Sequence, residues 1–458
     1  MVFSSILFLF YFMPLAFGVY YLMPSRWKNL TLLILSLIFY SWGEVRYFPI
    51  MLASIIVDYT ASNGIVRAGH KNGMRRLWLL FSVVFNLGML GFFKYAGFFA
   101  RNLNAVTGLG LPVLELTLPL GISFYTFQTM SYTIDVYRGD VAAERNIIDF
   151  GAFVVLFPQL IAGPIVRYTD IQRELRCRTV DPGQVSNGAR TFIMGLASKV
   201  IIANNVGALW TEVEAMDFAG LSTPLAWMAL LAFTLQIYFD FSGYSLMAIG
   251  LGRMLGFEFP QNFNFPYISK SMTEFWRRWH MTLGSWFRQY MYIPLGGNRK
   301  GALRTVFNLF LVWAATGLWH GASWNFVLWG LYFFVLLMLE KAFLRPVLDG
   351  HPVFARVYMI PLVMLSWAIF AITDLPQLGI FFGRLFAFSG GTDWGYFLRN
   401  YGVTFALGVL FSTPALKKSF QRFEKNRLFA ALAYGALFLI SVAYLVDATY
   451  NPFLYFRF

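Results

Sequence analysis

Charged residues and cysteines are scarce in this sequence. Asp, Glu, Lys and Arg together make up 13% of its 458 residues, whereas about a quarter of an ordinary soluble domain is charged. The hydrophobic fraction is 58% and the aromatic fraction is 19%. This composition excludes a soluble globular protein and predicts a polytopic membrane protein. The single cysteine, Cys177, excludes an intrachain disulfide and a cysteine-ligated metal site.

Motifs for metals and nucleotide cofactors are also absent. The sequence contains no His-x-x-x-His, no His-Glu-x-x-His, no paired cysteines and no Asp-rich loop, so we predict no metal. It contains no Gly-x-Gly-x-x-Gly that opens a helix after a strand and no Walker-type loop. No period of about 20 to 50 residues recurs, which excludes solenoids and disfavours a transporter built from inverted repeats.

Basic residues exceed acidic ones, with 36 Lys and Arg against 22 Asp and Glu. In a membrane protein such an excess indicates cytoplasmic loops rather than a nucleic-acid partner, and we predict no nucleic acid. We therefore expect the loops 66–76, 166–190 and 414–427 to face the cytoplasm. Their basic residues are Arg67, His70, Lys71, Arg75 and Arg76, then Arg167, Arg173, Arg176, Arg178 and Arg190, then Lys417, Lys418, Arg422, Lys425 and Arg427.

Apolar segments follow one another along the whole chain and predict an all-α fold. They cover 3–23, 29–43, 47–65, 77–94, 114–134, 147–165, 190–209, 224–251, 304–320, 322–340, 354–373, 399–413 and 428–447. We expect about ten to thirteen transmembrane or re-entrant helices, plus interfacial ones. The first segment lacks a basic n-region and a small-residue cleavage site, so it is predicted to be a retained helix. One domain, 1–458, is the simplest organisation.

Residues 253–304 form the longest interruption of this pattern. They carry eight basic residues against two acidic ones. The aromatic and Pro-containing stretch 256–266 is expected to be an interfacial loop. An amphipathic interfacial helix should follow, with Ser271 as its N-cap and Glu274 three residues later. Its apolar face would hold Phe275, Trp276, Trp279, Leu283, Trp286, Phe287 and Tyr290, with His280 at the edge.

Two of the four histidines, His280 and His320, are candidate functional residues. His320 lies inside an apolar segment long enough to cross a bilayer, where ionisable groups are costly and usually functional. A core histidine that is hydrogen-bonded between helices is the alternative for His320, and a histidine that anchors an interfacial helix is the alternative for His280. Gly317 and Gly321 flank His320 at a spacing that allows close helix approach or a local opening beside the imidazole.

Seven stretches distributed over the chain share a pattern with one family. They are 1–5, 118–128, 157–165, 236–245, 275–300, 314–325 and 451–458. In this order they resemble the membrane-bound O-acyltransferase family, and most closely its alginate O-acetylation branch. Leu246 and Gln289 depart from the branch pattern, which usually has Asp at both positions, and these departures bear on the choice of substrate.

The resemblance implies a ring of tilted helices around a central tunnel, with a catalytic core of about 115–340 that includes the segment 253–304. It implies that His320 is the general base and that His280 is a second tunnel residue. The expected reaction moves an acetyl group from a cytoplasmic thioester, acetyl-CoA, to an exported or cell-wall polysaccharide. Alginate, cellulose, another exopolysaccharide and peptidoglycan are the candidate acceptors. The bacterial inner membrane is the expected location, and an extracytoplasmic acetyltransferase is an expected partner.

Further residues are candidates for binding the donor or lining the tunnel. The basic cluster Arg277, Arg278, Arg288, Arg299 and Lys300 suits the phosphates of coenzyme A, and anionic lipid headgroups are the alternative ligand. Asp240 lies inside an apolar segment, where a buried pair with a basic residue is the alternative to a functional role. The remaining candidates are Trp276, Trp313, Thr316, Ser323, Trp324 and Asn325, of which Trp313, Thr316, Ser323 and Trp324 share the face of His320 at helical spacing. For these four, packing or an interface belt is the alternative to lining the tunnel.

Two functions from other classes remain open. A transporter or flippase for a lipid-linked glycan would explain many helices with an intramembrane Asp and His, but it predicts discontinuous helices in two corresponding halves. A non-catalytic scaffold for an extracytoplasmic acetyltransferase is the other possibility. Loss of acyl transfer on substitution of His320 would separate both from an enzyme.

Overall fold

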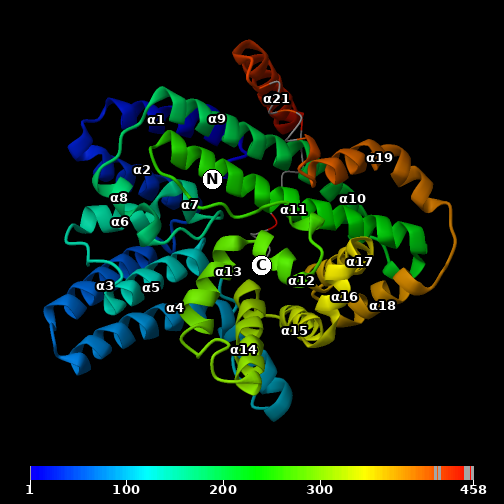
Figure 1. Ribbon diagram of the computed structural model, residues 1–458, viewed down its shortest axis with the longest axis horizontal. Coiled ribbons are helices and arrows are strands. Elements are labelled where there is room, and N and C mark those ends of the chain that lie inside the picture. Colours follow the sequence, from blue (N-terminus) through cyan, green and yellow to red (C-terminus); the bar gives the residue numbers. More distant parts are fainter. Residues whose placement is uncertain (1, 417–419, 421–423, 448–453, 455–458) are drawn as a thin grey trace. The chain divides into compact units, whose positions relative to one another are not determined.

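The computed structural model describes residues 2–416, 420, 424–447 and 454, and within these residues it contains helices and loops but no strand. The predicted all-α class is confirmed. Internal contacts divide the chain into two units. The first consists of Met1–Phe192 with Met247–Pro260, and the second of Ile193–Leu246 with Gln261–Phe458. Two of the boundaries fall inside helices, α9 and α11 in the numbering of Figure 1, and the third falls between Pro260 and Gln261, in the loop after α11.

The first unit begins with eight helices in chain order. They are α1 (Met13–Leu22), α2 (Lys28–Gly43), α3 (Phe48–Arg67), α4 (Asn72–Thr107), α5 (Ile122–Arg138), α6 (Ile147–Val155), α7 (Phe157–Leu160) and α8 (Tyr168–Arg176). Helix α9 (Pro182–Ala197) follows and continues into the second unit. Gly121, at a φ of 72°, precedes the first residue of α5, and its left-handed conformation is one that glycine adopts without strain.

Two polar networks lie inside the first unit. Asp58 on α3 accepts hydrogen bonds from Ser82, from Asn86 at 2.8 Å and from Thr133 at 3.0 Å. These donors come from α4 and α5, so the carboxylate joins three helices. Every partner in this network is a neutral donor, which satisfies the carboxylate without a cation.

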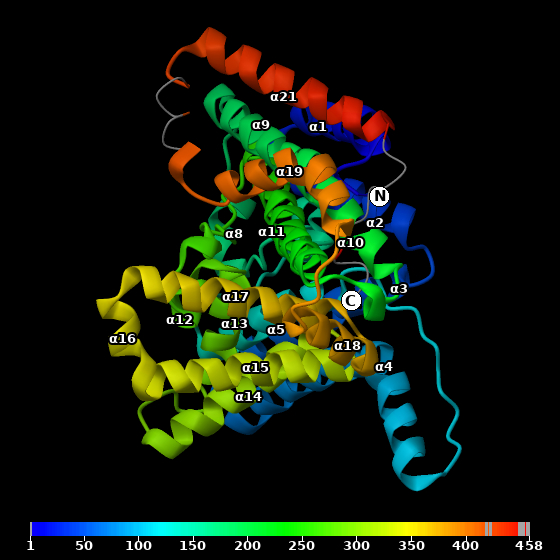
Figure 2. The same ribbon diagram turned by 90° about the vertical axis from the view of Figure 1, so that its right-hand side faces the viewer.

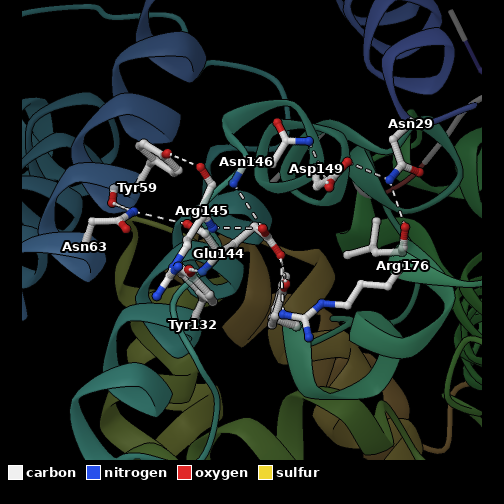
Figure 3. A network of polar contacts seen from close by, with 11 residues as sticks. Asn29, Tyr59, Asn63, Tyr132, Glu144, Arg145, Asn146, Asp149 and Arg176 are labelled. Carbon is white, nitrogen blue, oxygen red and sulfur yellow. Dashed lines mark hydrogen bonds and ion pairs between the residues drawn. The ribbon is translucent and has the colours of Figure 1, made fainter. Parts of the chain in front are cut away.

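The second network is centred on Glu144 and is drawn in Figure 3. Its carboxylate accepts hydrogen bonds from the backbone N–H of Arg145 at 2.8 Å and of Asn146 at 3.0 Å. The Tyr168 hydroxyl donates to it at 2.7 Å, and the Arg176 guanidinium lies 3.7 Å away. Because its oxygens are occupied by contacts that hold a loop against α8, we interpret Glu144 as structural.

Further helices belong mainly to the second unit. They are the π-helical turn Ser198–Ala203, α10 (Asn204–Glu214), α11 (Thr223–Met254), α12 (Met272–Arg278), α13 (Met281–Phe287), the π-helical turn Arg288–Tyr292, α14 (Ala302–His320), α15 (Trp324–Leu339), α16 (Arg345–Gly350), α17 (Pro352–Ala371), α18 (Leu375–Phe386), α19 (Asp393–Phe411) and α21 (Arg427–Asp447). Figure 2 shows α15 alongside α14 and α17, and the contacts of α15 with both helices agree.

Eight helices among the described residues are long and apolar enough to cross a membrane. They are Phe48–Arg67, Asn72–Thr107, Pro182–Glu214, Thr223–Met254, Ala302–His320, Trp324–Gly350, Pro352–Ala371 and Arg427–Asp447. The multi-pass membrane protein predicted from the sequence is confirmed. Some of the expected segments outside this set are shorter or interrupted: α2 has 16 residues, and the segment 147–165 breaks at Leu156. A new helix starts there at Phe157, because Pro158 has no N–H with which to continue the previous one.

The continuous amphipathic helix predicted after Ser271 is wrong in one respect. The Ser271 hydroxyl does accept from the Glu274 N–H at 3.0 Å, so the predicted N-cap is confirmed. The helix ends at Arg278, however, and a second one starts at Met281. Between them His280 takes a left-handed conformation with φ of 43°. Most of the aromatic face is nevertheless buried, including Phe275, whereas Trp276 and Tyr290 are half-buried.

Two predictions at the C-terminal end lie partly outside the described residues. In the basic loop 414–427, the predicted basic residues Lys417, Lys418 and Arg422 lie outside the described residues. In the closing stretch 451–458, every residue except Leu454 lies outside them. The central tunnel that the resemblance implies stays a prediction.

Candidate active site

Helices α14 and α15 cross at two glycines, which brings the end of α14 close to α15. A Cβ on Gly317 would overlap the Phe326 carbonyl oxygen and lie 3.3 Å from the Gly330 Cα. A Cβ on Gly330 would lie 2.5 Å from the Trp313 carbonyl oxygen. Neither position has room for a side chain, so the close helix approach predicted at Gly317 is confirmed. Gly321, the other glycine of the predicted spacing, follows the end of α14 and faces the Phe326 ring instead. His320 lies three residues after Gly317, at the last position of α14.

His320 is 9% exposed and is surrounded by aromatic rings. Its ring centroid lies 4.9 Å from that of Trp329 on α15 and 5.3 Å from that of Phe370 on α17, both at near-perpendicular angles. Trp319 on its own helix is 5.1 Å away. Three helices therefore contribute to the surroundings of this imidazole, which lies in an apolar region of the second unit.

His280 lies in the turn between α12 and α13 and is 1% exposed. Its ring meets the Phe241 ring edge-on at 4.7 Å, and the Trp319 ring lies 6.0 Å away. Its Nδ1 is 3.1 Å from Asn262 Oδ1. Burial lowers the pKa of His280 to about 3, so the imidazole is neutral at physiological pH. The predicted position at the edge of an interfacial helix is therefore wrong, because the break at His280 turns the ring inwards.

A group of tryptophans joins the predicted donor region to His320. Trp276 on α12 lies 4.8 Å from Trp313 and 5.6 Å from Trp329, between ring centroids. Trp329 in turn contacts His320. The indole N–H groups of Trp276 and Trp329 are buried and have no acceptor in the described part of the chain. Two of the predicted residues, Trp276 and Trp313, are thus brought together, and Trp329 connects them to His320.

Comparisons with known proteins identify the family of the chain. The family model described as MBOAT, membrane-bound O-acyltransferase family, matches residues 142–374, just over half of the chain and including both histidines. The chain belongs to the membrane-bound O-acyltransferase family. The probable alginate O-acetylase AlgI of Azotobacter vinelandii is 44% identical over 402 residues, which are 86% of this chain and 79% of that protein.

Two further relatives support the same family. The probable alginate O-acetylase AlgI of Pseudomonas putida is 40% identical over 100% of both chains. The peptidoglycan O-acetyltransferase of Helicobacter pylori is 34% identical over 413 residues, which are 82% of this chain and 78% of that protein. The resemblance read from the sequence is confirmed, and the chain is an O-acetyltransferase.

The other predicted residues on α14 and α15 of this acyltransferase occupy different environments. The Thr316 hydroxyl donates to the Val312 carbonyl at 2.7 Å, within its own helix. Asn325 is buried, and its amide donates to the Ile369 and Phe370 carbonyls at 3.1 Å each. It therefore ties α15 to the part of α17 that contacts His320.

The prediction that Ser323 and Trp324 share a helical face with His320 is wrong. Helix α14 ends at His320, and Ser323 is the N-cap of α15. Trp324 is 51% exposed. The chain changes direction over Gly321–Ser323, so positions on the two sides of this break do not share a helical face. A role of Ser323 and Trp324 in substrate binding stays a prediction.

The basic cluster of the acyltransferase divides into engaged and available residues. Arg278 forms an ion pair with Glu274 at 2.8 Å and donates to the Asn264 carbonyl at 3.1 Å. Arg277 and Arg288 are exposed. Arg299 and Lys300 are exposed too. Arg278 is thus partly committed to holding α12, whereas the exposed arginines are free to meet an anionic group.

Asp240 on α11 takes part in a buried ion pair. Its Oδ1 lies 2.5 Å from the Lys199 Nζ, and both side chains are almost fully buried. Its Oδ2 accepts from the Leu454 backbone N–H at 3.0 Å. The structural alternative considered for Asp240, a buried pair with a basic residue, is what the structure contains.

Two residues near the site have only a weak signal in the sequence pattern. Glu340 follows α15 and accepts hydrogen bonds from the Met272 N–H at 2.5 Å and the Thr273 N–H at 3.0 Å, at the start of α12. Asn262 contacts His280. A polar residue at the end of an apolar segment and an Asn in a Pro-containing loop are the weak signals that were available for them.

The geometry provides the groups that acyl transfer requires. The two imidazoles lie near a common indole, that of Trp319, and the ring of Trp329, whose N–H has no acceptor in the described part of the chain, lies beside His320. An imidazole can take a proton from a hydroxyl, and an N–H in apolar surroundings can stabilise negative charge on a carbonyl oxygen.

Proposed function

We propose that this O-acetyltransferase passes an acetyl group from acetyl-CoA, or another cytoplasmic thioester, to a hydroxyl of an exported or cell-wall polysaccharide, with His320 as the general base. The observation that carries the proposal is the placement of His320 at the end of a close helix crossing, among aromatic rings and within the region that matches the family. The bacterial inner membrane is the proposed location.

In this mechanism His320 accepts the proton of the acceptor hydroxyl while the oxygen attacks the thioester carbonyl carbon. A C–O bond forms, and the carbonyl oxygen gains negative charge. The Trp329 N–H, whose ring lies against His320, is the candidate donor to that oxygen. The C–S bond then breaks, and the proton held by His320 passes to the thiolate that leaves.

An alginate-type polysaccharide is the favoured acceptor. The relatives named as alginate O-acetylases are 40 to 44% identical to this chain, whereas the peptidoglycan O-acetyltransferase is 34% identical. Transfer through an extracytoplasmic acetyltransferase partner remains part of the proposal, because the acceptor is outside the cytoplasm. The exposed Arg277 and Arg288 are the proposed contacts for the donor phosphates.

The test is acetyl transfer by the purified protein in nanodiscs, with acetyl-CoA and alginate oligosaccharides, in the presence and absence of the partner. His320→Gln keeps hydrogen-bonding capacity but removes the titrating nitrogen. We expect its rate to fall about 10²- to 10⁴-fold with the donor KM nearly unchanged. His351→Gln, which changes an exposed histidine, is the matched control. Full activity of His320→Gln would refute the assignment of the base and would favour a scaffold.

A further inference from the structure

Asn262 lies directly beside His280 and is fully buried. Its Oδ1 is 3.1 Å from His280 Nδ1, 3.3 Å from the Thr282 backbone nitrogen and 2.9 Å from the Thr282 hydroxyl. Its Nδ2 donates to the Ser245 hydroxyl at 3.1 Å. One amide side chain therefore contacts both sides of the turn that carries the imidazole.

These contacts fix the protonation of the two imidazole nitrogens. A backbone N–H can only donate, so the Asn262 atom that faces Thr282 must be the oxygen. The same oxygen faces His280 Nδ1, which must then carry a hydrogen. A neutral imidazole has only one N–H, so its Nε2 carries a lone pair. Burial lowers the pKa of His280 to about 3, which keeps the ring neutral.

The Nε2 of His280 is buried and has no hydrogen-bond partner in the described part of the chain. A buried polar atom without a partner is rare in a folded protein and calls for an explanation, of which a ligand is one. The left-handed backbone conformation of His280 also supports a functional role, since such conformations of non-glycine residues cluster at functional sites. The ring also contacts Trp319, the neighbour of His320.

We propose that Asn262 is a positioning residue of the active site: it holds His280 in its Nδ1–H form, so that the Nε2 lone pair accepts a hydrogen bond from a substrate. The substrate group is an N–H or O–H donor. The amide N–H of the thioester's pantetheine arm and a hydroxyl of the polysaccharide both have this chemistry. The inference rests on the proposed function and adds a binding role for the second histidine.

The backbone of Asn262 makes the side chain testable without loss of the turn. Its carbonyl oxygen accepts from the Met281 N–H at 2.9 Å, and this bond survives any side-chain substitution. Asn262→Leu removes the Oδ1 contact. Asn262→Asp keeps an oxygen facing Nδ1 and is the conservative variant. Asn264→Ala is the matched control, because Asn264 is exposed and two residues away.

The first readout is the tautomer of His280, measured by nitrogen NMR of the full-length protein with labelled histidine, assigned with His280→Gln. We expect the Nδ1–H form in the unmodified protein, in Asn262→Asp and in Asn264→Ala, and a mixture of forms in Asn262→Leu. The Nε2–H form in the unmodified protein would overturn the proposal. This readout does not depend on activity, so it stands even if His320 is not the base.

The second readout is steady-state kinetics with both substrates varied. We expect Asn262→Leu to lower kcat/KM about 10- to 100-fold, as is typical when a histidine loses its orienting partner, and Asn262→Asp to restore most of it. An increase confined to the KM of acetyl-CoA identifies the pantetheine amide as the bound group, and one confined to the KM of the polysaccharide identifies a hydroxyl. Unchanged kinetics in Asn262→Leu would overturn the proposal.

Discussion

His280 and His320, separated by 40 positions in the sequence, share one ring neighbour, the indole of Trp319. Trp319 is buried and belongs to α14, whereas His280 lies in the turn between α12 and α13. The contact places the two imidazoles on one continuous aromatic cluster. A change in the position of either α12 or α14 therefore alters the relation between the two histidines.

The crossing of α14 and α15 provides the first prediction. Gly317→Ala would force a Cβ into the Phe326 carbonyl. Because backbone atoms cannot rotate away, we expect the helices to separate and the protein to lose about 1–3 kcal/mol of stability. Thermal unfolding in detergent measures the loss. Gly379→Ala, at a helical glycine with open space around it, is the control and should unfold at the temperature of the unmodified protein. Equal midpoints for the two variants would contradict the predicted crossing.

Local patterns in the sequence were sufficient to predict several features of the fold and of the candidate site. The apolar segments predicted the helices, the glycine spacing predicted the close approach at Gly317, and Ser271 with Glu274 predicted the start of α12. Each of these depends on residues only a few positions apart. The family motifs added the two histidines, which no spacing rule would have selected together.

The break at His280 could not be predicted in this way. Neither Gly nor Pro occurs at positions 278–281, so a helical pattern continues through them. The turn is held by Asn262, 18 positions earlier, through its side chain and its backbone carbonyl. The rings of Trp329 and Phe370 that surround His320 likewise come from other helices, α15 and α17, so a local pattern around His320 does not reveal them. Long-range packing overrides local propensity here, and only the structure reveals it.

The buried state of His280 predicts a dependence of stability on pH. Its pKa is lowered by burial to about 3, from the ordinary 6.5 of an unfolded chain. Between these values the unfolded chain binds more protons than the folded one, so stability falls as the pH drops below 6.5. From pH 6.5 to pH 5 this group costs about 2 kcal/mol.

Thermal unfolding at pH 7 and pH 5 measures this contribution. His280→Gln cannot titrate, so its midpoint should fall less between the two pH values than that of the unmodified protein. Asn264→Ala should retain the full pH dependence. If His280→Gln loses as much stability on acidification as the unmodified protein, His280 is not buried in its neutral form.

Because the arginines of the basic cluster differ in exposure and pairing, we expect their substitution to have different effects on donor binding and stability. Arg277 and Arg288 are exposed, whereas Arg278 is paired with Glu274. Arg277→Glu combined with Arg288→Glu should raise the KM for acetyl-CoA, because each charge-assisted hydrogen bond to phosphate contributes about 1.5–3 kcal/mol. Stability should change little.

Arg278→Glu should instead lower stability, since it places two carboxylates side by side on α12. Kinetics in nanodiscs of neutral and of anionic lipid separate donor binding from lipid binding. An unchanged KM for acetyl-CoA in the double variant, together with weaker retention in anionic nanodiscs, would assign the two exposed arginines to lipid headgroups.

The hydrogen bonds of Glu340 link the end of α15 to the start of α12, and through α12 to the position of His280. Its carboxylate is buried and accepts from the N–H groups of Met272 and Thr273 and from the Thr273 hydroxyl at 2.9 Å. These N–H groups begin α12 and have no partner within the helix, so a carboxylate there also interacts favourably with the helix dipole. Glu340 thereby fixes the end of α12 opposite to the turn that holds His280.

Glu340→Ala removes this cap and should cost about 1–2 kcal/mol of stability. Because α12 then starts without its partner, we also expect kcat/KM to fall, as His280 leaves its place beside Trp319. Glu340→Gln retains one acceptor oxygen and should lose less of both quantities. Asp349→Ala removes a carboxylate whose ion pair with Arg345 is exposed, and such pairs contribute about 0–1 kcal/mol, so it is the control. Unfolding midpoints and steady-state kinetics measured on the same preparations test this prediction. A Glu340→Ala protein as stable and as active as Asp349→Ala would show that α12 keeps its position without the cap.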